Sequence, residues 1–180
     1  MKRMRKMIAM VLAAVMALCM LAGMAAADGE LEEVICKEQE FSTKIPAGKT
    51  AEFSKDDSSL YIYAEEPGYI PYVLVSRRPL DMKFSSPENF LNNVFREHIE
   101  DSYGDDCLGM NPAKEMEIGG KKLLGAKYLY KVGEHVITLI RLIEVRDGGD
   151  VEYTIKYADV DDQAVTALAE EVIRNYQEIN

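Results

Sequence analysis

Apolar residues occupy both alternating positions of the segment His135–Val145. Successive side chains of a strand point to opposite faces, so this pattern predicts a strand that is covered on both sides. One side would carry Val136, Ile140 and Leu142, and the other Ile137, Leu139, Ile143 and Val145. We therefore expect His135–Val145 to be the central strand of a sheet that packs against helices.

The segments around this strand predict an antiparallel meander. Lys114–Ile118 follows a loop through Asn111-Pro112, and Leu123–Val132 comes next with regular alternation. Val151–Tyr157 also alternates, with Glu152, Thr154 and Lys156 at the polar positions, which predicts a strand with one wet face. The connections are short and contain glycine, as hairpin turns do: Gly119-Gly120, Gly133-Glu134 and Asp147–Asp150.

Earlier segments predict further strands and a helix. The β-rich segments are Phe41–Gly48, Thr50–Ser54, Leu60–Ala64 and Ile70–Val75. A helix is predicted from Ser86, a favourable cap, through Pro87 at the first helical position to a stop near Tyr103-Gly104. Its apolar face would carry Phe90, Leu91, Val94, Phe95, His98 and Ile99.

A second amphipathic helix is predicted from Asp162 to about Tyr176. Its apolar stripe consists of Val165, Leu168, Ala169, Val172, Ile173 and Tyr176. The order strands, helix, meander, helix predicts an α+β fold. We expect an antiparallel sheet of about six or seven strands with helices packed on its faces, an α/β/α sandwich.

The first 27 residues have the anatomy of a secretory signal peptide. A basic start precedes the apolar run Met7–Leu21, and the small residues Ala25-Ala26-Ala27 follow as a cleavage site. The alternative is a retained membrane anchor, for which the run is near the short limit. We expect cleavage after Ala27, an acidic segment over residues 28–38, and a single domain over residues 39–180.

Charge and cysteine content narrow the classes of partner. Removing the leader lowers the number of Lys and Arg residues from 21 to 17, while all 31 Asp and Glu residues remain. The cleaved chain would therefore have a formal charge of −14. This charge repels nucleic acid phosphates and anionic lipids, so we expect no nucleic acid partner and no stable membrane insertion after cleavage. The remaining cysteines, Cys36 and Cys107, predict a disulfide in an exported chain, with two separate buried thiols as the alternative.

The arrangement of elements resembles the PsbP-like fold, a helix–sheet–helix sandwich of exported bacterial and chloroplast-lumen proteins. The residues that carry the resemblance are Phe41-Ser42 with Ile45-Pro46, Gly119-Gly120-Lys121, Tyr153 with Ile155-Lys156-Tyr157, and the closing helix. The resemblance implies a non-enzymatic accessory or binding domain. It assigns no catalytic or cofactor residue to any position of this chain.

Metal and catalytic chemistry have little support in the sequence. His98 with Asp101, Asp105 and Asp106 is a poor ligand set for zinc, and the acidic loop around Gly104 lacks the spacing of a calcium-binding EF-hand. The side chain of His98 is expected to be partly buried and satisfied. No nucleophile elbow, phosphate-binding loop or HExxH motif is present. We expect no cofactor and no metal.

Ten tyrosines form an excess that a contact surface would explain. The alternative is that tyrosine is simply a good strand residue. The candidate recognition set is Tyr128, Tyr130, Tyr153, Tyr157 and Arg141, the one charged residue inside the central strand. A structural ion pair is the alternative role for Arg141.

We therefore predict a secreted or cell-envelope bacterial accessory module without catalytic activity. Its partner would be an unknown protein or cell-envelope ligand. The alternatives are a small extracellular enzyme with a cleft at the sheet edge, or a calcium-responsive domain.

Overall fold

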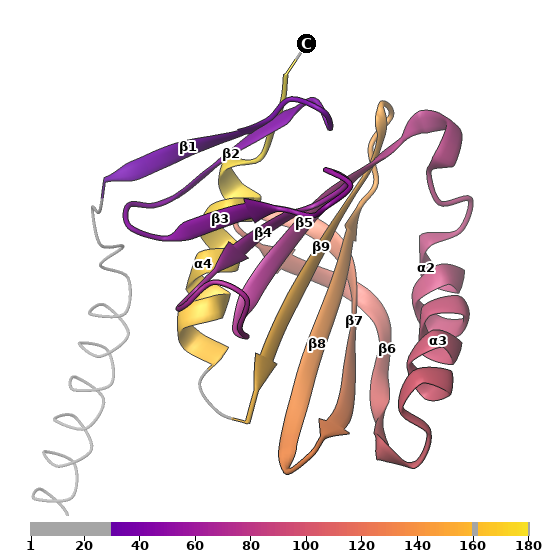
Figure 1. Ribbon diagram of the computed structural model, residues 1–180. Helices are drawn as coiled ribbons and strands as arrows, with labels where there is room; N and C mark the ends of the chain where they lie inside the picture. The colour runs from indigo at the N-terminus through magenta and orange to yellow at the C-terminus, as the bar shows by residue number, and fades with distance from the viewer. Residues whose placement is uncertain (1–29, 160–161, 180) are drawn as a thin grey trace, which may run out of the picture. The chain divides into compact units, whose positions relative to one another are not determined.

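The computed structural model describes residues 30–159 and 162–179 (Figure 1). Residues 31–159 and 162–179 belong to one compact unit. The predicted signal peptide, residues 1–27, lies outside the described residues.

The larger of two sheets has seven antiparallel strands in the order β3-β4-β5-β9-β8-β7-β6. The strands are β3 (Thr50–Phe53), β4 (Leu60–Tyr63), β5 (Tyr72–Pro79), β6 (Cys107–Ile118), β7 (Lys121–Val132), β8 (His135–Glu144) and β9 (Gly149–Ala158). The predicted meander is confirmed by β6 to β9, and β9 then joins it to β5.

A smaller sheet has the order β1-β2-β10. It consists of β1 (Leu31–Cys36), β2 (Phe41–Pro46) and β10 (Gln177–Glu178). Its first strand, β1, lies in the acidic segment over residues 28–38. Arg77 on β5 connects the two sheets, because its guanidinium lies 2.8 Å from a carboxylate oxygen of Glu40 and 3.8 Å from one of Glu178.

The predicted helix after Ser86 is confirmed and contains a π-helical turn. It runs through α2 (Pro87–Asn89), η2 (Phe90–Val94) and α3 (Phe95–Tyr103), between the short turns η1 (Leu80–Met82) and η3 (Gly104–Asp106). The Ser86 hydroxyl caps it by accepting from the Asn89 backbone N–H, and Gly104 ends it with φ of +52°. The closing helix is α4 (Asp162–Asn175). None of the described helices is long and apolar enough to cross a membrane.

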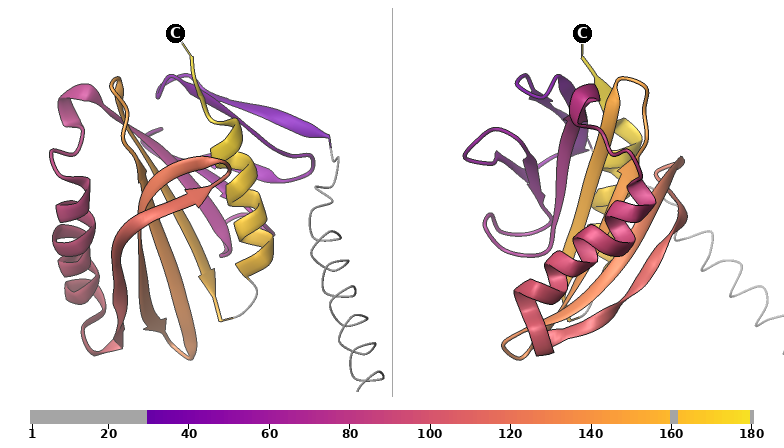
Figure 2. Two further views of the ribbon diagram at one scale, coloured as in Figure 1. Left: turned by 180° about the vertical axis from the view of Figure 1, so that it is seen from behind. Right: turned by 90° about the vertical axis from the view of Figure 1, so that its right-hand side faces the viewer.

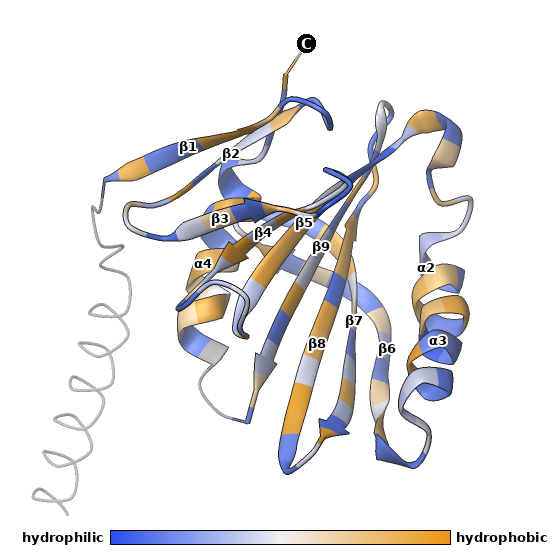
Figure 3. Cartoon of the chain, in the orientation of Figure 1, coloured by the Kyte–Doolittle hydropathy of each residue, from blue (hydrophilic) through white to orange (hydrophobic). Residues whose placement is uncertain are grey.

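The helices cover opposite faces of the larger sheet (Figure 2). Under α4 lies a cluster that includes Leu142, while Ile137, Leu139 and Ile143 of the same strand belong to the cluster under α3. Both apolar sides of β8 are therefore covered, as the sequence predicted, and Figure 3 shows most of this strand as hydrophobic.

The central position is held by β9 rather than by β8, since β9 is fourth of the seven strands. The wet face predicted for this strand is also wrong at two of its three positions. Glu152 and Thr154 are each 5% exposed, and only Lys156 is partly exposed. Alternation of polar and apolar residues shows that a strand has two different faces. It does not show whether the polar face is exposed to solvent or covered by another element.

Glu152 is buried among charged partners beneath the helical segment. Its carboxylate pairs with Arg141 of β8 and lies 3.6 Å from the guanidinium of Arg78 on β5. The Arg141 guanidinium also lies 4.0 Å from the ring centre of Phe95, and Arg78 lies 4.1 Å from that of Phe84. The ion pair considered for Arg141 is thus present, and it links the sheet to its aromatic cover.

Strand β6 begins at Cys107, seven residues before the predicted start at Lys114. Its pairing with β7 is shifted between Cys107 and Gly109 and again between Asn111 and Lys114. The second shift contains Pro112, which cannot donate to a ladder and is tolerated at a bulge. A strand with bulges does not keep regular alternation, so the sequence pattern hid its first half.

The turn Gly119-Gly120 between β6 and β7 is confirmed, and it contacts α4. Both glycines have positive φ, +59° and +76°, as a tight hairpin turn requires. A Cβ on Gly119 would lie 2.6 Å from the carbonyl oxygen of Glu170 and 2.9 Å from the backbone nitrogen of Arg174. A Cβ on Gly120 would meet nothing within 4 Å.

We expect Gly119→Ala to destabilise the domain more than Gly120→Ala does. Both substitutions place a side chain at positive φ, at a cost of about 1–2 kcal/mol. Gly119→Ala also forces the turn away from the α4 backbone, which adds roughly 1–3 kcal/mol. Urea unfolding of both variants measures the difference, and equal losses would contradict the close contact between turn and helix.

We expect Glu152→Gln to lower the free energy of unfolding by about 3–5 kcal/mol, because it leaves two arginines without their buried counter-charge. The same substitution at Glu115, an exposed partner of Lys122 at 3.3 Å, is expected to cost less than about 1 kcal/mol. Thermal and urea unfolding of both variants test this, and similar losses would show that the buried pair contributes little.

Candidate functional site

Strand register brings tyrosines from β4 and β5 into one row with a lysine from β9. Tyr63 lies opposite Tyr72, and Tyr72 lies opposite Lys156. Residues directly opposite each other in paired strands point to the same face. This face also carries Tyr61, which lies opposite Leu74.

The rings are in mutual contact. The ring centre of Tyr61 lies 6.2 Å from that of Tyr63 and 5.3 Å from that of Tyr72. Beyond Lys156, Tyr103 stacks on Tyr130 with ring centres 3.9 Å apart. The Lys156 ammonium lies 5.8 Å from the centre of the Tyr130 ring and so joins the two groups. We call this set the tyrosine face: Tyr61, Tyr63, Tyr72, Tyr103, Tyr130 and Lys156.

The helical cover is restricted to one end of this sheet face. Segments η2 and α3 pack against β6 and β7, whereas the front of β3, β4 and β5 carries none of the described helices (Figure 1). Tyr61, Tyr72, Tyr103 and Lys156 are consequently partly exposed, while Tyr63 and Tyr130 are buried and support their neighbours.

Burial raises the pKa of three phenols of this face. It raises the pKa of Tyr72 to about 12, and it also raises the pKa of Tyr130 and, together with the nearby Glu52, that of Tyr63. A neutral phenol donates and accepts hydrogen bonds. Lys156 forms no ion pair with another described residue, so its charge is available to a carboxylate of a partner.

This arrangement is suited to binding. Aromatic rings with polar tips provide large, rigid contact area and hydrogen bonds at the same time. Among the described residues, no three His, Cys, Asp or Glu side chains are grouped closely enough to hold a metal ion.

The structure corrects the recognition set inferred from the sequence. Tyr128 and Tyr130 are buried under α3, where the Tyr128 hydroxyl donates to the Leu91 carbonyl at 2.5 Å. Tyr153 and Tyr157 are buried on the opposite face with α4. These four rings therefore do not share a contact surface. The guanidinium of Arg141 is paired with Glu152, and a role for Arg141 in recognition stays a prediction.

The sequence predicts only part of the tyrosine face. The recognition set inferred from the sequence contains Tyr130 but not Tyr72, Tyr103 or Lys156. Their meeting depends on how β5 pairs with β9 and on where α3 ends. The available signal was the spacing of Tyr61 and Tyr63, which places both on one face of a strand.

The predicted disulfide is not formed in the structure, where Cys36 and Cys107 are both free thiols. Cys36 belongs to the cluster under α4, and Cys107 packs against the cluster under α3. The larger sheet thus separates the two cysteines. A disulfide would require their Cα atoms to lie within about 7 Å of each other. Burial raises the pKa of the Cys36 thiol, which disfavours the reactive thiolate.

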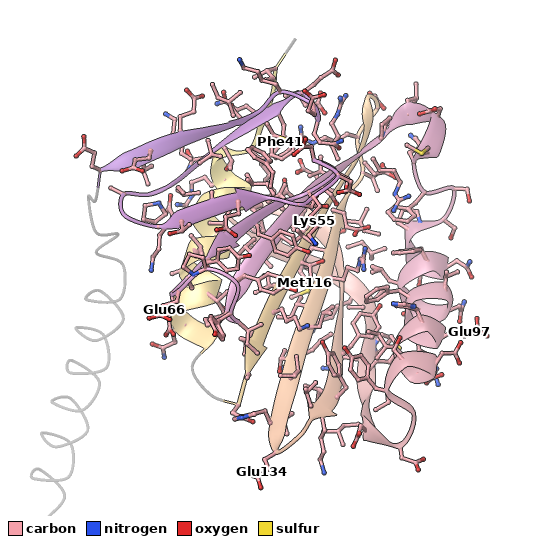
Figure 4. All side chains as sticks on the ribbon, viewed as in Figure 1. Phe41, Lys55, Glu66, Glu97, Met116 and Glu134 are labelled. Carbon is pink, nitrogen blue, oxygen red and sulfur yellow. The ribbon has the colours of Figure 1, made fainter. Side chains whose placement is uncertain are left out.

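Two cavities lie away from the tyrosine face. One of about 230 Å³ is lined by Ile35, Cys36, Lys37, Glu38, Phe53 and Asp57. The other, of about 250 Å³, is lined by Asn93, Arg96, Glu97 and Glu100, on the side of α3 that points away from the sheet (Figure 4). His98 lines neither cavity and is exposed rather than partly buried, because it lies at the margin of the helix face that contacts the sheet.

Asp159 follows β9 and contacts the start of β8. Its carboxylate accepts from the Val136 backbone N–H at 2.6 Å and binds the His135 ring. These contacts lower the pKa of Asp159 and join the end of β9 to the start of β8. His135 itself is exposed.

Comparison with solved structures identifies the fold. The cyanobacterial PsbP protein (CyanoP) of Synechocystis matches with a TM-score of 0.57 and 15% identity, over 86% of this chain and 95% of that chain. The Ran-binding protein Mog1p of Saccharomyces cerevisiae matches with a TM-score of 0.49 and 12% identity, over 85% and 97% of the two chains. A protein of Bacteroides thetaiotaomicron matches with a TM-score of 0.47 and 16% identity, over 84% of this chain but only 49% of that one.

No family model matches the sequence. No curated protein matches it either. At these identities a structural match reports the fold and not the activity. The match to the cyanobacterial protein agrees with the seven-stranded antiparallel sheet between two helical layers, and the described domain has the PsbP-like fold.

Proposed function

We propose that the protein is a non-catalytic accessory module that acts outside the cytoplasm and binds a protein partner through the tyrosine face. The observation that carries this proposal is the row Tyr63, Tyr72 and Lys156, on a part of the sheet face without a helical cover. The predicted signal peptide supports the location.

The chemistry of the face favours a protein surface as ligand. Tyr61, Tyr72 and Tyr103 offer contact area with few rotatable bonds, so little conformational entropy is lost on binding. Lys156 lies between them and offers a single positive charge within a chain of formal charge −10. A partner segment with aromatic or aliphatic side chains beside a carboxylate satisfies both features.

We expect the variant Tyr61→Ala/Tyr72→Ala to lose its partner while it remains folded. Truncation of aromatic residues at the centre of an interface commonly costs about 2 kcal/mol each, so affinity should fall by more than about tenfold. The experiment is a pull-down from the cell-envelope extract of the producing bacterium, with recovered proteins quantified by mass spectrometry.

Tyr69→Ala is the matched control for that experiment, since Tyr69 is 69% exposed in the neighbouring loop and makes no ring contact among the described residues. It should recover the partner as the wild type does. Recovery of the same proteins by the double variant would contradict binding through the tyrosine face.

The proposed location has its own test. We expect protein exported by a bacterial host to begin at Asp28, which intact-mass measurement detects directly. The variant Ala25→Leu/Ala27→Leu places bulky residues at the cleavage site and should retain the leader. An exported wild-type protein that keeps its first 27 residues would contradict the proposal.

A further inference from the structure

Strand β1 has one unpaired edge in the described part of the protein. It pairs with β2 over its whole length, from Leu31 opposite Pro46 to Cys36 opposite Phe41. It is the outermost strand of its sheet. The second edge of this six-residue strand therefore presents backbone N–H and C=O groups to an incoming chain.

The side chains of β1 protect its edge by negative charge alone. Leu31 and Ile35 are 41% and 47% exposed and lie on the outer side, while Val34 and Cys36 pack inward. Natural edge strands are commonly guarded by charged residues, proline or a bulge, because exposed apolar edges recruit other strands. The strand Leu31–Cys36 contains no proline and no bulge, and its charged residues, Glu32 and Glu33, are both acidic.

Unpaired carboxylates surround this edge. The exposed acids are Glu32, Glu33 and Glu38, and none of them forms an ion pair with another described residue. Lys44 on β2 lies opposite Glu33, and Lys37 follows the strand, so acidic groups remain in excess. Such a surface attracts a basic segment and repels an acidic one.

A cavity lies at the carboxyl end of the same strand. Its walls include Ile35 and Phe53, and Cys36, Lys37, Glu38 and Asp57 complete the lining. Its volume is about 230 Å³, whereas an apolar cavity of about 150 Å³ already accommodates benzene. It is therefore large enough for one aromatic or branched aliphatic side chain.

We infer that the free edge of β1 binds an extended basic segment of another protein by strand addition, with one apolar side chain of that segment in the Ile35–Phe53 cavity. In this mode backbone hydrogen bonds supply affinity, and pockets for alternate side chains supply specificity. The site uses different residues from the tyrosine face and does not depend on it.

Charge argues against a second copy of this chain as the occupant. Pairing two β1 strands brings Glu32 and Glu33 of both copies onto neighbouring strands, where like charges are destabilising. A basic strand instead neutralises these carboxylates. We therefore expect the partner segment to alternate basic and apolar residues.

The test titrates the chain from Asp28 to Asn180 into a fluorescent six-residue peptide, the length of β1, in which lysine alternates with valine and a phenylalanine ends the sequence. We expect saturable binding in fluorescence anisotropy and slower amide exchange in Leu31–Cys36. A matched glutamate–valine peptide, and a lysine peptide with proline at the valine positions, should each bind more than about tenfold more weakly.

The variant Glu32→Lys/Glu33→Lys should bind the basic peptide with an affinity more than about tenfold lower than that of the wild type, and should bind the acidic peptide more tightly than the wild type does. Glu65→Lys/Glu66→Lys, which changes the net charge equally in an exposed loop, should bind within about twofold of the wild type. Phe53→Ser should weaken binding of the phenylalanine peptide, while Leu108→Ser, at similar exposure, should not.

Three results would overturn the inference. They are equal binding of the proline peptide, equal losses in the two charge-reversed variants, and a wild-type dimer in sedimentation that Ile35→Ser dissociates. The variant Tyr61→Ala/Tyr72→Ala separates this inference from the proposed function, since it should bind the basic peptide as the wild type does.

Discussion

The buried carboxylate of Glu152 is the interaction on which the α3 side of this fold depends. It lies on the central strand β9, and its two arginine partners come from the adjacent strands β5 and β8. Charges removed from water are tolerated only when they are paired closely, so the positions of Arg78 and Arg141 are restricted together. Both guanidinium groups also face aromatic rings of the segment between β5 and β6, and thereby fix where this segment lies on the sheet.

The two faces of the larger sheet are covered to different extents, and this difference leaves room for recognition. Helix α4 packs on one face against a continuous apolar cluster, while α3 covers only the part of the other face near β6 and β7. The remaining part carries Tyr61, Tyr72 and Lys156 instead of aliphatic residues. The β1–β2 hairpin adds a second accessible feature, a strand edge with acidic flanks. The tyrosine face and the β1 edge consist of different residues and come from different sheets of the described domain.

Much of the architecture could be predicted because it depends on local patterns. The two-sided apolar run around Ile140, the cap at Ser86 and the turn at Gly119 each reflect constraints within a few residues, and each was located correctly. The acidic residues of β9 could not be interpreted in the same way. A glutamate at an alternating polar position predicts a solvent-exposed side chain. Glu152 is buried and paired only because the tertiary structure places helical cover and two arginines from other strands beside it.

The sequence by itself determined the α+β class, the order of the elements and the resemblance to the PsbP-like fold, since hydrophobic periodicity and turn residues report local conformation. The tertiary structure decided which strands are neighbours, and through this which side chains meet. The pairing of β5 with β9 brings Tyr72 beside Lys156, and the intervening sheet keeps Cys36 and Cys107 in separate clusters. The physical reason is that strand register and helix placement are set by packing between residues far apart in the chain, so no local pattern contains them.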